Sequence, residues 1–228
     1  MIWERAKRIY MEAFIFDMDG IIVDSEPVHS RTKLETLRHF GLDFAPERLE
    51  RYMGRTSRAL FADALREQGR EGLDPEELVR YKHQLYLNIL QDGSSLQPVA
   101  GTLEVIAGLQ AAGMPLAVAS SAGRSIIEAV LDFFGIRTAF AVVVSGTELP
   151  HGKPDPGVYL LAARQLGAAP SACAVLEDAA AGVAAAKAAG MYCIAYRNPA
   201  SGQQNLSAAD KIIGKISWKK ISECLKNR

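Results

Sequence analysis

Cysteine is scarce in this sequence, and its three cysteines, Cys173, Cys193 and Cys224, lie far apart. They form neither a CxxC pair nor the even-numbered set that cross-links a small secreted domain. Two of them lie in apolar runs, where a small buried thiol is the ordinary interpretation. We therefore expect free cysteines in a reducing compartment, and we predict a cytoplasmic location.

An excess of charge of either sign is also missing, because 26 Lys and Arg residues balance 26 Asp and Glu residues. A chain without a positive field is not expected to bind nucleic acid or an anionic membrane surface. No uncharged stretch approaches the roughly 20 apolar residues of a membrane span. The first residues, MIWERAKRIYME, mix both signs of charge and lack the apolar segment of a signal peptide. We expect no nucleic acid and no membrane as partners.

The sequence is instead rich in short apolar runs, each followed by a segment with apolar residues at helical spacing. The runs cover residues 13–16, 116–119, 141–144, 172–176, 192–196 and, more weakly, 211–213. Short apolar strands that alternate with helices are typical of a parallel sheet covered on both faces. The predicted fold class is therefore α/β, with a doubly wound, Rossmann-like parallel sheet. Such sheets bind ligands beyond the carboxyl ends of their strands.

One segment interrupts this alternation, since residues 25 to 91 have a helical pattern throughout. Pro46 and Pro75 stand where helices begin, and Gly41, Gly54 and Gly69 stand where helices end. We expect an inserted all-helical cap domain, residues 25–94, and an α/β catalytic core made of residues 1–24 and 95–228. The hinges are predicted at residues 24–27 and 92–98.

Polar side chains follow four of the predicted strands. Asp17 and Asp19 follow the first, Ser120 the second, Lys153 lies in the loop after the third, and the pair Glu177–Asp178 follows the fourth. The carboxyl ends of parallel strands converge, so these residues can form one site. Several carboxylates close together repel one another, and a hard cation such as Mg²⁺ relieves that repulsion with oxygen ligands.

This set of groups suits phosphoryl transfer. A carboxylate nucleophile divides the reaction into two steps through an aspartyl-phosphate, while a cation and a lysine neutralise the transferring oxygens. A second carboxyl group protonates the leaving alkoxide and then accepts a proton from water. Asp17 and Asp19 point differently along an extended strand exit, and Gly20 allows a sharp turn after them.

Four segments carry a family resemblance: FDMDGIIVDSEPVH, VASS, HGKPDP and LEDAAAG. In order and spacing they resemble the motifs of the haloacid dehalogenase (HAD) superfamily, and within it the β-phosphoglucomutase-like branch with a small helical cap. The resemblance implies Asp17 as nucleophile, Asp19 as general acid/base and Lys153 and Ser120 as phosphate contacts. It also implies Mg²⁺ held by Asp17, the backbone carbonyl of Asp19, Asp178 and Glu177.

The resemblance implies further substrate contacts, and for His29, Arg55 and Arg58 an exposed or helix-starting position is an equal alternative. His29 stands just past the hinge, where related enzymes direct a histidine towards the acid/base. The segment GRTSR, with Arg55, Thr56 and Arg58, matches a cap loop that covers the substrate. Ser121 adjoins Ser120, and Arg124 lies one position from a phosphate-contacting lysine of the sugar mutases.

The function that we predict is a Mg²⁺-dependent phosphatase acting on a small phosphorylated metabolite, a sugar phosphate, as a monomer or weak homodimer. A β-phosphoglucomutase-type mutase is the alternative, although Ser57 and Gly123 stand where the mutases place an arginine and a lysine. A haloacid dehalogenase has no need of Asp19, and no feature marks Lys33 or Lys82 as the cap lysine of a phosphonatase. A catalytically silent binding module on the same fold also stays open.

Overall fold

The computed structural model describes residues 11–52, 56–92 and 96–226 of the chain. Its centre is a six-stranded sheet in the order β3-β2-β1-β4-β5-β6, with every neighbouring pair parallel. The strands are β1 (Ala13–Phe16), β2 (Leu116–Ser120), β3 (Val142–Ser145), β4 (Cys173–Glu177), β5 (Tyr192–Tyr196) and β6 (Lys211–Ile213). The predicted doubly wound α/β fold is confirmed, with β1 in the middle between β2 and β4.

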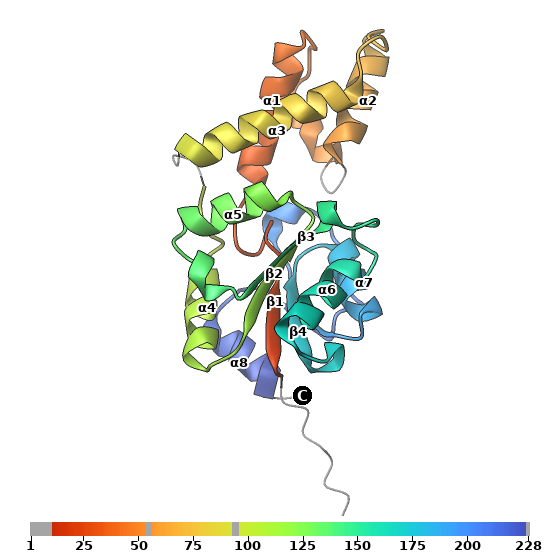
Figure 1. Cartoon of the computed structure of the whole chain (residues 1–228). Coiled ribbons are helices and arrows are strands. Elements are labelled where there is room, and N and C mark those ends of the chain that lie inside the picture. Colours follow the sequence, from red (N-terminus) through yellow and green to blue (C-terminus); the bar gives the residue numbers. More distant parts are fainter. Residues whose placement is uncertain (1–10, 53–55, 93–95, 227–228) are drawn as a thin grey trace, which may run out of the picture.

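The sheet is buried on both faces because alternate residues of each strand point to opposite sides. In β1, Phe14 and Phe16 pack on one face, whereas Ala13 and Ile15 pack on the other. The first face is covered by α4 (Thr102–Ala111), α5 (Arg124–Phe133) and α8 (Trp218–Lys226). The second face is covered by α6 (Gly157–Leu166) and α7 (Ala180–Ala188), and Figure 1 shows the two layers on either side of the strands.

The segment between β1 and α4 is helical, as predicted. It contains α1 (Glu26–His39), a 3₁₀-helix (Pro46–Tyr52), α2 (Ser57–Glu67) and α3 (Pro75–Asp92). These helices lie together at the upper end of the molecule in Figure 1, beyond the carboxyl ends of the strands. They surround a hydrophobic cluster of their own, which includes Leu37, Leu60, Phe61, Leu65 and Leu78.

Two backbone contacts join the chain segments that enter and leave this helical part. The N–H of Asp24 donates to the carbonyl of Gln97 at 2.9 Å, and the N–H of Val99 donates to the carbonyl of Ile22 at 3.1 Å. The two segments therefore run side by side where the helical part meets the sheet. No helix among the described residues is long and apolar enough to cross a membrane.

Candidate active site

Three buried acidic side chains meet at the carboxyl end of the sheet. Asp17 follows β1, while Glu177 ends β4 and Asp178 follows it. The neighbouring strands fix their relative height, since the N–H of Asp17 donates to the carbonyl of Leu176 at 3.0 Å. One carboxylate oxygen from each acid lies within 4.8 Å of the others. Residues separated by more than half the chain thus share one small volume.

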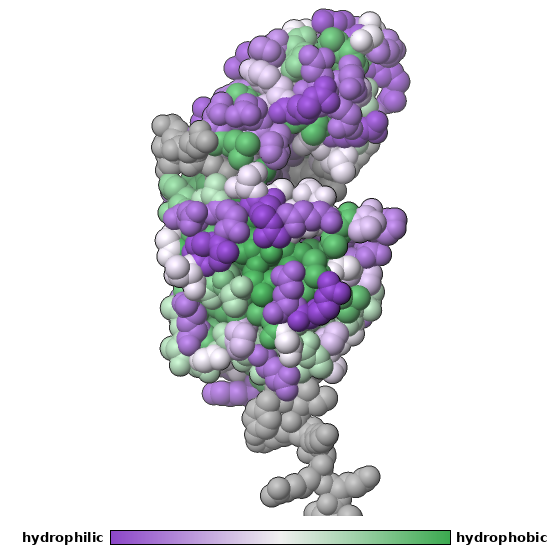
Figure 2. Space-filling model, in the orientation of Figure 1, coloured by the Kyte–Doolittle hydropathy of each residue, from purple (hydrophilic) through white to green (hydrophobic). Residues whose placement is uncertain are grey.

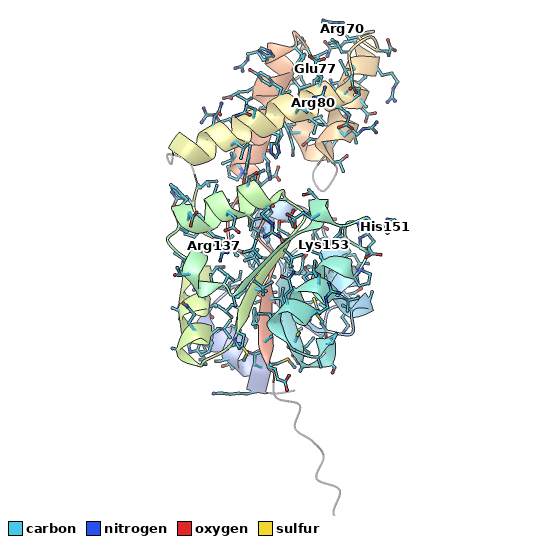
Figure 3. The ribbon with its side chains drawn as sticks, in the orientation of Figure 1. Arg70, Glu77, Arg80, Arg137, His151 and Lys153 are labelled. Atoms are coloured by element: carbon cyan, nitrogen blue, oxygen red, sulfur yellow. The ribbon has the colours of Figure 1, made fainter. Side chains whose placement is uncertain are left out.

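Lys153 links two of these acids. Its Nζ lies 2.6 Å from Oδ1 of Asp17 and 2.7 Å from Oε1 of Glu177, and Figure 3 shows it at the upper edge of the sheet, below the helical part. Burial lowers the pKa of Lys153, but the charges of Asp17 and Glu177 outweigh burial and hold that pKa above its usual value. The lysine therefore stays cationic beside Asp17.

Glu177 is held by four donors. Its Oε1 accepts from Lys153 and from the hydroxyl of Tyr159 at 2.9 Å, and its Oε2 accepts from the backbone N–H groups of Asp178 and Ala179 at 2.8 and 2.9 Å. Gly182 lets the carboxylate fit, because a Cβ there would lie 1.5 Å from Oε1. Tyr159 was missed by the sequence reasoning, because it stands six residues after Lys153 and beyond the HGKPDP segment.

Burial and mutual repulsion disfavour the charged forms of Asp17 and Asp178. Burial, followed by the charges of Glu177, Asp178 and Asp19, raises the pKa of Asp17 against the opposing effect of Lys153. Burial and the charge of Glu177 likewise raise the pKa of Asp178 to about 6. A hard divalent cation takes oxygen ligands at about 2.0–2.6 Å and would relieve both effects. The donor set and its burial thus fit Mg²⁺.

Asp19 points towards the helical part and meets His29 of α1. The Nε2 atom of His29 lies 3.5 Å from Oδ1 of Asp19. Burial alone raises the pKa of Asp19, but contact with His29, followed by Ser25 and the charge of Lys82, outweighs it and lowers the pKa. The structure therefore brings His29 to the acid that sequence reasoning assigned to proton transfer.

Lys82 of α3 orients this histidine. Its Nζ lies 2.9 Å from Nδ1 of His29, and an ammonium group can only donate. Nδ1 therefore accepts, and the ring proton sits on Nε2, facing Asp19. The ring of Tyr86 stacks on His29 with centroids 4.8 Å apart, and burial raises the pKa of the Tyr86 hydroxyl. Lys82 and Tyr86 lie four residues apart on one helical face. The sequence shows this spacing but does not show that the face meets His29.

Ser120 is the last residue of β2, and Arg124 is the first residue of α5. Ser120 is buried, and its Oγ accepts from the N–H of Ala122 at 3.0 Å. Arg124 forms a paired contact with Glu148, at 2.6 and 2.7 Å, and also donates to the carbonyl of Val143 at 3.0 Å. The guanidinium of Arg124 therefore joins the start of α5 to β3 and to the 3₁₀-helix Gly146–Glu148 that follows β3.

A cleft of about 680 Å³ lies between the helical part and the sheet, the two parts that Figure 2 shows as an upper and a lower lobe. Four of the residues that the sequence proposed for the site line this cleft: Asp19, His29, Thr56 and Ser121. Arg58 pairs with Glu76 instead and is exposed, and Arg55 lies outside the described residues. Lys33 and Lys82, which the sequence did not mark for any function, also line the cleft, together with Glu26 and His83, which sequence reasoning did not name.

Comparison with known proteins identifies the class to which this fold and site belong. The model of the haloacid dehalogenase-like hydrolase family matches residues 14–196. The chain belongs to this family, as its four sequence motifs predict.

The individual relatives include a named sugar phosphatase. Fructose-1-phosphate phosphatase YqaB of Escherichia coli K12 is 35% identical over 183 residues, covering 80% of this chain and 95% of YqaB. The crystal structure of CbbY from Rhodobacter sphaeroides in complex with phosphate superposes with a TM-score of 0.78 at 29% identity, covering 90% and 94% of the two chains. A β-phosphoglucomutase structure from Clostridium difficile, 22% identical, superposes with a TM-score of 0.74 over 95% and 98% and shows the same fold.

Proposed function

We propose that this chain is a Mg²⁺-dependent phosphatase that hydrolyses a small sugar phosphate through an aspartyl-phosphate on Asp17. Membership of the family and identity to a named phosphatase support an enzyme of the phosphatase class. The observation that carries the proposal is the meeting of Lys153, Asp17, Glu177 and Asp178 at one end of the sheet.

Asp17 is the proposed nucleophile. Lys153, at 2.6 Å, holds its carboxylate and stays cationic, so one positive charge is already in place for the phosphoryl oxygens. Asp17, Asp178 and the backbone carbonyl of Asp19 would hold Mg²⁺. The bound ion would supply the remaining positive charge that phosphoryl transfer requires. Glu177, with four donors on its oxygens, positions Lys153 and the start of α7.

Asp19 is the proposed proton-transfer group. Its lowered pKa favours the carboxylate, which is the form that accepts a proton from the water attacking the aspartyl-phosphate. His29, oriented by Lys82, presents an N–H towards the same carboxylate. Closure of the helical part over the cleft would exclude water until the phosphoryl group has moved. We propose residues 25–94 as this cap domain.

The cleft supports a sugar phosphate as substrate. It offers hydroxyl, amine, imidazole and carboxylate groups from Thr56, Ser121, Lys82, His83 and Glu26, which match the hydroxyl groups of a sugar. YqaB is named for fructose 1-phosphate, a molecule of this class. We also propose a cytoplasmic location, consistent with three free, buried cysteines.

A mutase is the rival function, because a mutase must hold a second phosphate at the cap side of the cleft. Ser57 and Gly123 both line the cleft, and neither carries a charge. The two nearby arginines, Arg58 and Arg124, are paired with Glu76 and Glu148. These contacts favour hydrolysis.

The test is a panel of phosphorylated sugars, glucose 1-phosphate included, incubated with the protein and Mg²⁺. We expect release of inorganic phosphate, no isomerised sugar, and loss of activity with a chelator. Asp17→Asn is the matched control, since it keeps the shape of the side chain and removes the nucleophile. Isomerised sugar without phosphate release would identify a mutase, and no turnover on any substrate would identify a silent binding module.

A further inference from the structure

A loop outside the four sequence motifs holds the carboxylate of Asp178. The loop follows β5 and includes the short 3₁₀-helix Pro199–Ser201. Nδ2 of Asn198 donates to Oδ2 of Asp178 at 3.0 Å, and the hydroxyl of Ser201 donates to the same oxygen. Two neutral donors thus converge on one oxygen of a candidate metal ligand.

The amide of Asn198 is fixed in the orientation that this contact requires. Its Oδ1 accepts from the backbone N–H of Ala200 at 2.9 Å, so Nδ2 must face the site. The same Nδ2 also donates to the carbonyl of Gly20 at 3.2 Å. Asn198 therefore ties the turn that carries Asp19 to the carboxylate of Asp178.

The loop itself is anchored to the helix that follows Asp178. Oε1 of Gln204 accepts from the N–H of Ala180, the first residue of α7, at 3.0 Å. Nε2 of Gln204 donates to the carbonyl of Ser201 at 3.0 Å. Both side chains that face Asp178 thus have a fixed backbone behind them.

We propose that Asn198 and Ser201 are positioning residues that orient Asp178 for Mg²⁺. Both donors end on Oδ2, and among the described residues none donates to Oδ1, so the pair presents Oδ1 as the ligand atom. Neutral donors also hold the carboxylate without competing as cations for its charge. Partners of this kind orient metal ligands, and their loss costs about 10–100-fold in metal affinity or activity. The inference rests on the proposed function, which supplies the metal.

The test is calorimetric titration of Mg²⁺ into the metal-free full chain. We expect Asn198→Ala and Ser201→Ala each to weaken the Mg²⁺ Kd by about 10-fold or more. Activity should return towards wild type at high Mg²⁺, because the nucleophile and lysine are untouched. Ser201→Thr keeps the hydroxyl donor and should bind as wild type does. Asn205→Ala is the matched control, since Asn205 lies in the same loop and caps Ser207 instead.

Each outcome decides the matter. Wild-type Kd values in both folded alanine variants, as judged by circular dichroism, would overturn the inference and leave the proposed function standing. Weakened binding in Asn205→Ala to the same extent would also overturn it, because the effect would then belong to the loop as a whole. If the wild-type chain binds no Mg²⁺, the proposed function fails together with the inference.

Discussion

Gly20 and Asp178 approach so closely that no side chain fits between them. A Cβ on Gly20 would lie 1.9 Å from Oδ2 of Asp178 and 2.8 Å from Nδ2 of Asn198. The backbone of Gly20 also has a φ of +76°, a conformation that L-residues adopt at a cost. Glycine is therefore required here twice, once by the turn after Asp19 and once by the acid beside it.

Replacement of this glycine should separate the two requirements. Gly20→Ala is expected to lose stability and also to lose Mg²⁺ binding and turnover, because the methyl group displaces Asp178. Gly113→Ala is the matched control, since Gly113 has a φ of +70° with nothing within 4 Å of its Cβ position. In Gly113→Ala the free energy of unfolding should fall by only about 1–2 kcal/mol, the cost of this backbone conformation for an L-residue. Thermal unfolding measures the stability of each variant, and Mg²⁺ titration measures its metal binding. Equal metal binding by the two variants would contradict the steric argument.

The proton-transfer function of Asp19 predicts a dependence on the leaving group. Asp19→Ala should slow hydrolysis of a sugar phosphate by about 10²–10⁴-fold, the usual loss on removing a general acid or base. An alkoxide leaving group needs a proton, whereas p-nitrophenolate leaves with little assistance. Formation of the phosphoenzyme from p-nitrophenyl phosphate should therefore be slowed less. Its rate is measured as the burst of p-nitrophenolate in rapid-quench experiments. Equal losses on both substrates would remove the acid function from Asp19.

Lys82 predicts an alkaline limit to activity. Burial, followed by the charge of Lys33, lowers the pKa of Lys82 to about 8. Below that pH the ammonium donates to Nδ1 of His29 and keeps the Nε2 proton facing Asp19. Above it the amine is neutral and this tautomer is no longer enforced. We expect kcat/KM to fall as the pH rises through about 8, as a pH–rate profile would show.

Two lysine variants test the assignment of that limit. Lys33→Met removes a repelling cation, raises the pKa of Lys82 and should move the alkaline limb to higher pH. Lys82→Met should lower activity and abolish the limb. Lys220→Met, an exposed residue of α8, is the control and should leave the profile unchanged. A limb that stays in place in Lys33→Met would assign it to another group.

The raised pKa of Asp178 implies that the carboxylate needed for metal binding lowers the stability of the metal-free protein. Its pKa is raised to about 6 in the folded chain, against about 3.9 in an unfolded one. Folding thus favours the protonated acid, and this contribution to stability is present below about pH 4 and lost as the pH rises through 6. Near pH 7.5 the metal-free protein therefore carries the full cost of a buried, repelled carboxylate.

Asp178→Asn should relieve that cost. A shift of about two pKa units corresponds to at most about 3 kcal/mol, so in a chelator at pH 7.5 the Tm should rise by several degrees. The gain should shrink at pH 5. Added Mg²⁺ should raise the Tm of the wild type and not that of the variant. Asp132→Asn, at an exposed position, is the control for loss of one charge. A lower Tm for Asp178→Asn in chelator would show that the acids do not repel as described.

The sequence by itself predicted the strands well because each is a short apolar run bounded by polar residues or glycine. The predicted run 13–16 coincides with β1, and the runs near β2, β3 and β4 differ from the strands by a residue at one or both ends. Segment 46–52 was expected to be helical and forms a tighter 3₁₀-helix. Asp17, Lys153, Glu177 and Asp178 were also predicted to meet, because a parallel sheet places the residues after its strands at one edge.

Only the tertiary structure decided which side chains support the site and which are bound elsewhere. Lys82 contacts His29 across 53 positions, Asn198 contacts Asp178 across 20, and Arg124 turns away to Glu148 across 24. Periodicity along a chain reports which face of an element is buried, since burial repeats with the helical or strand period. It does not report which polar group on another element lies opposite. That depends on how the helices and loops pack on the sheet, and so on the folded chain as a whole.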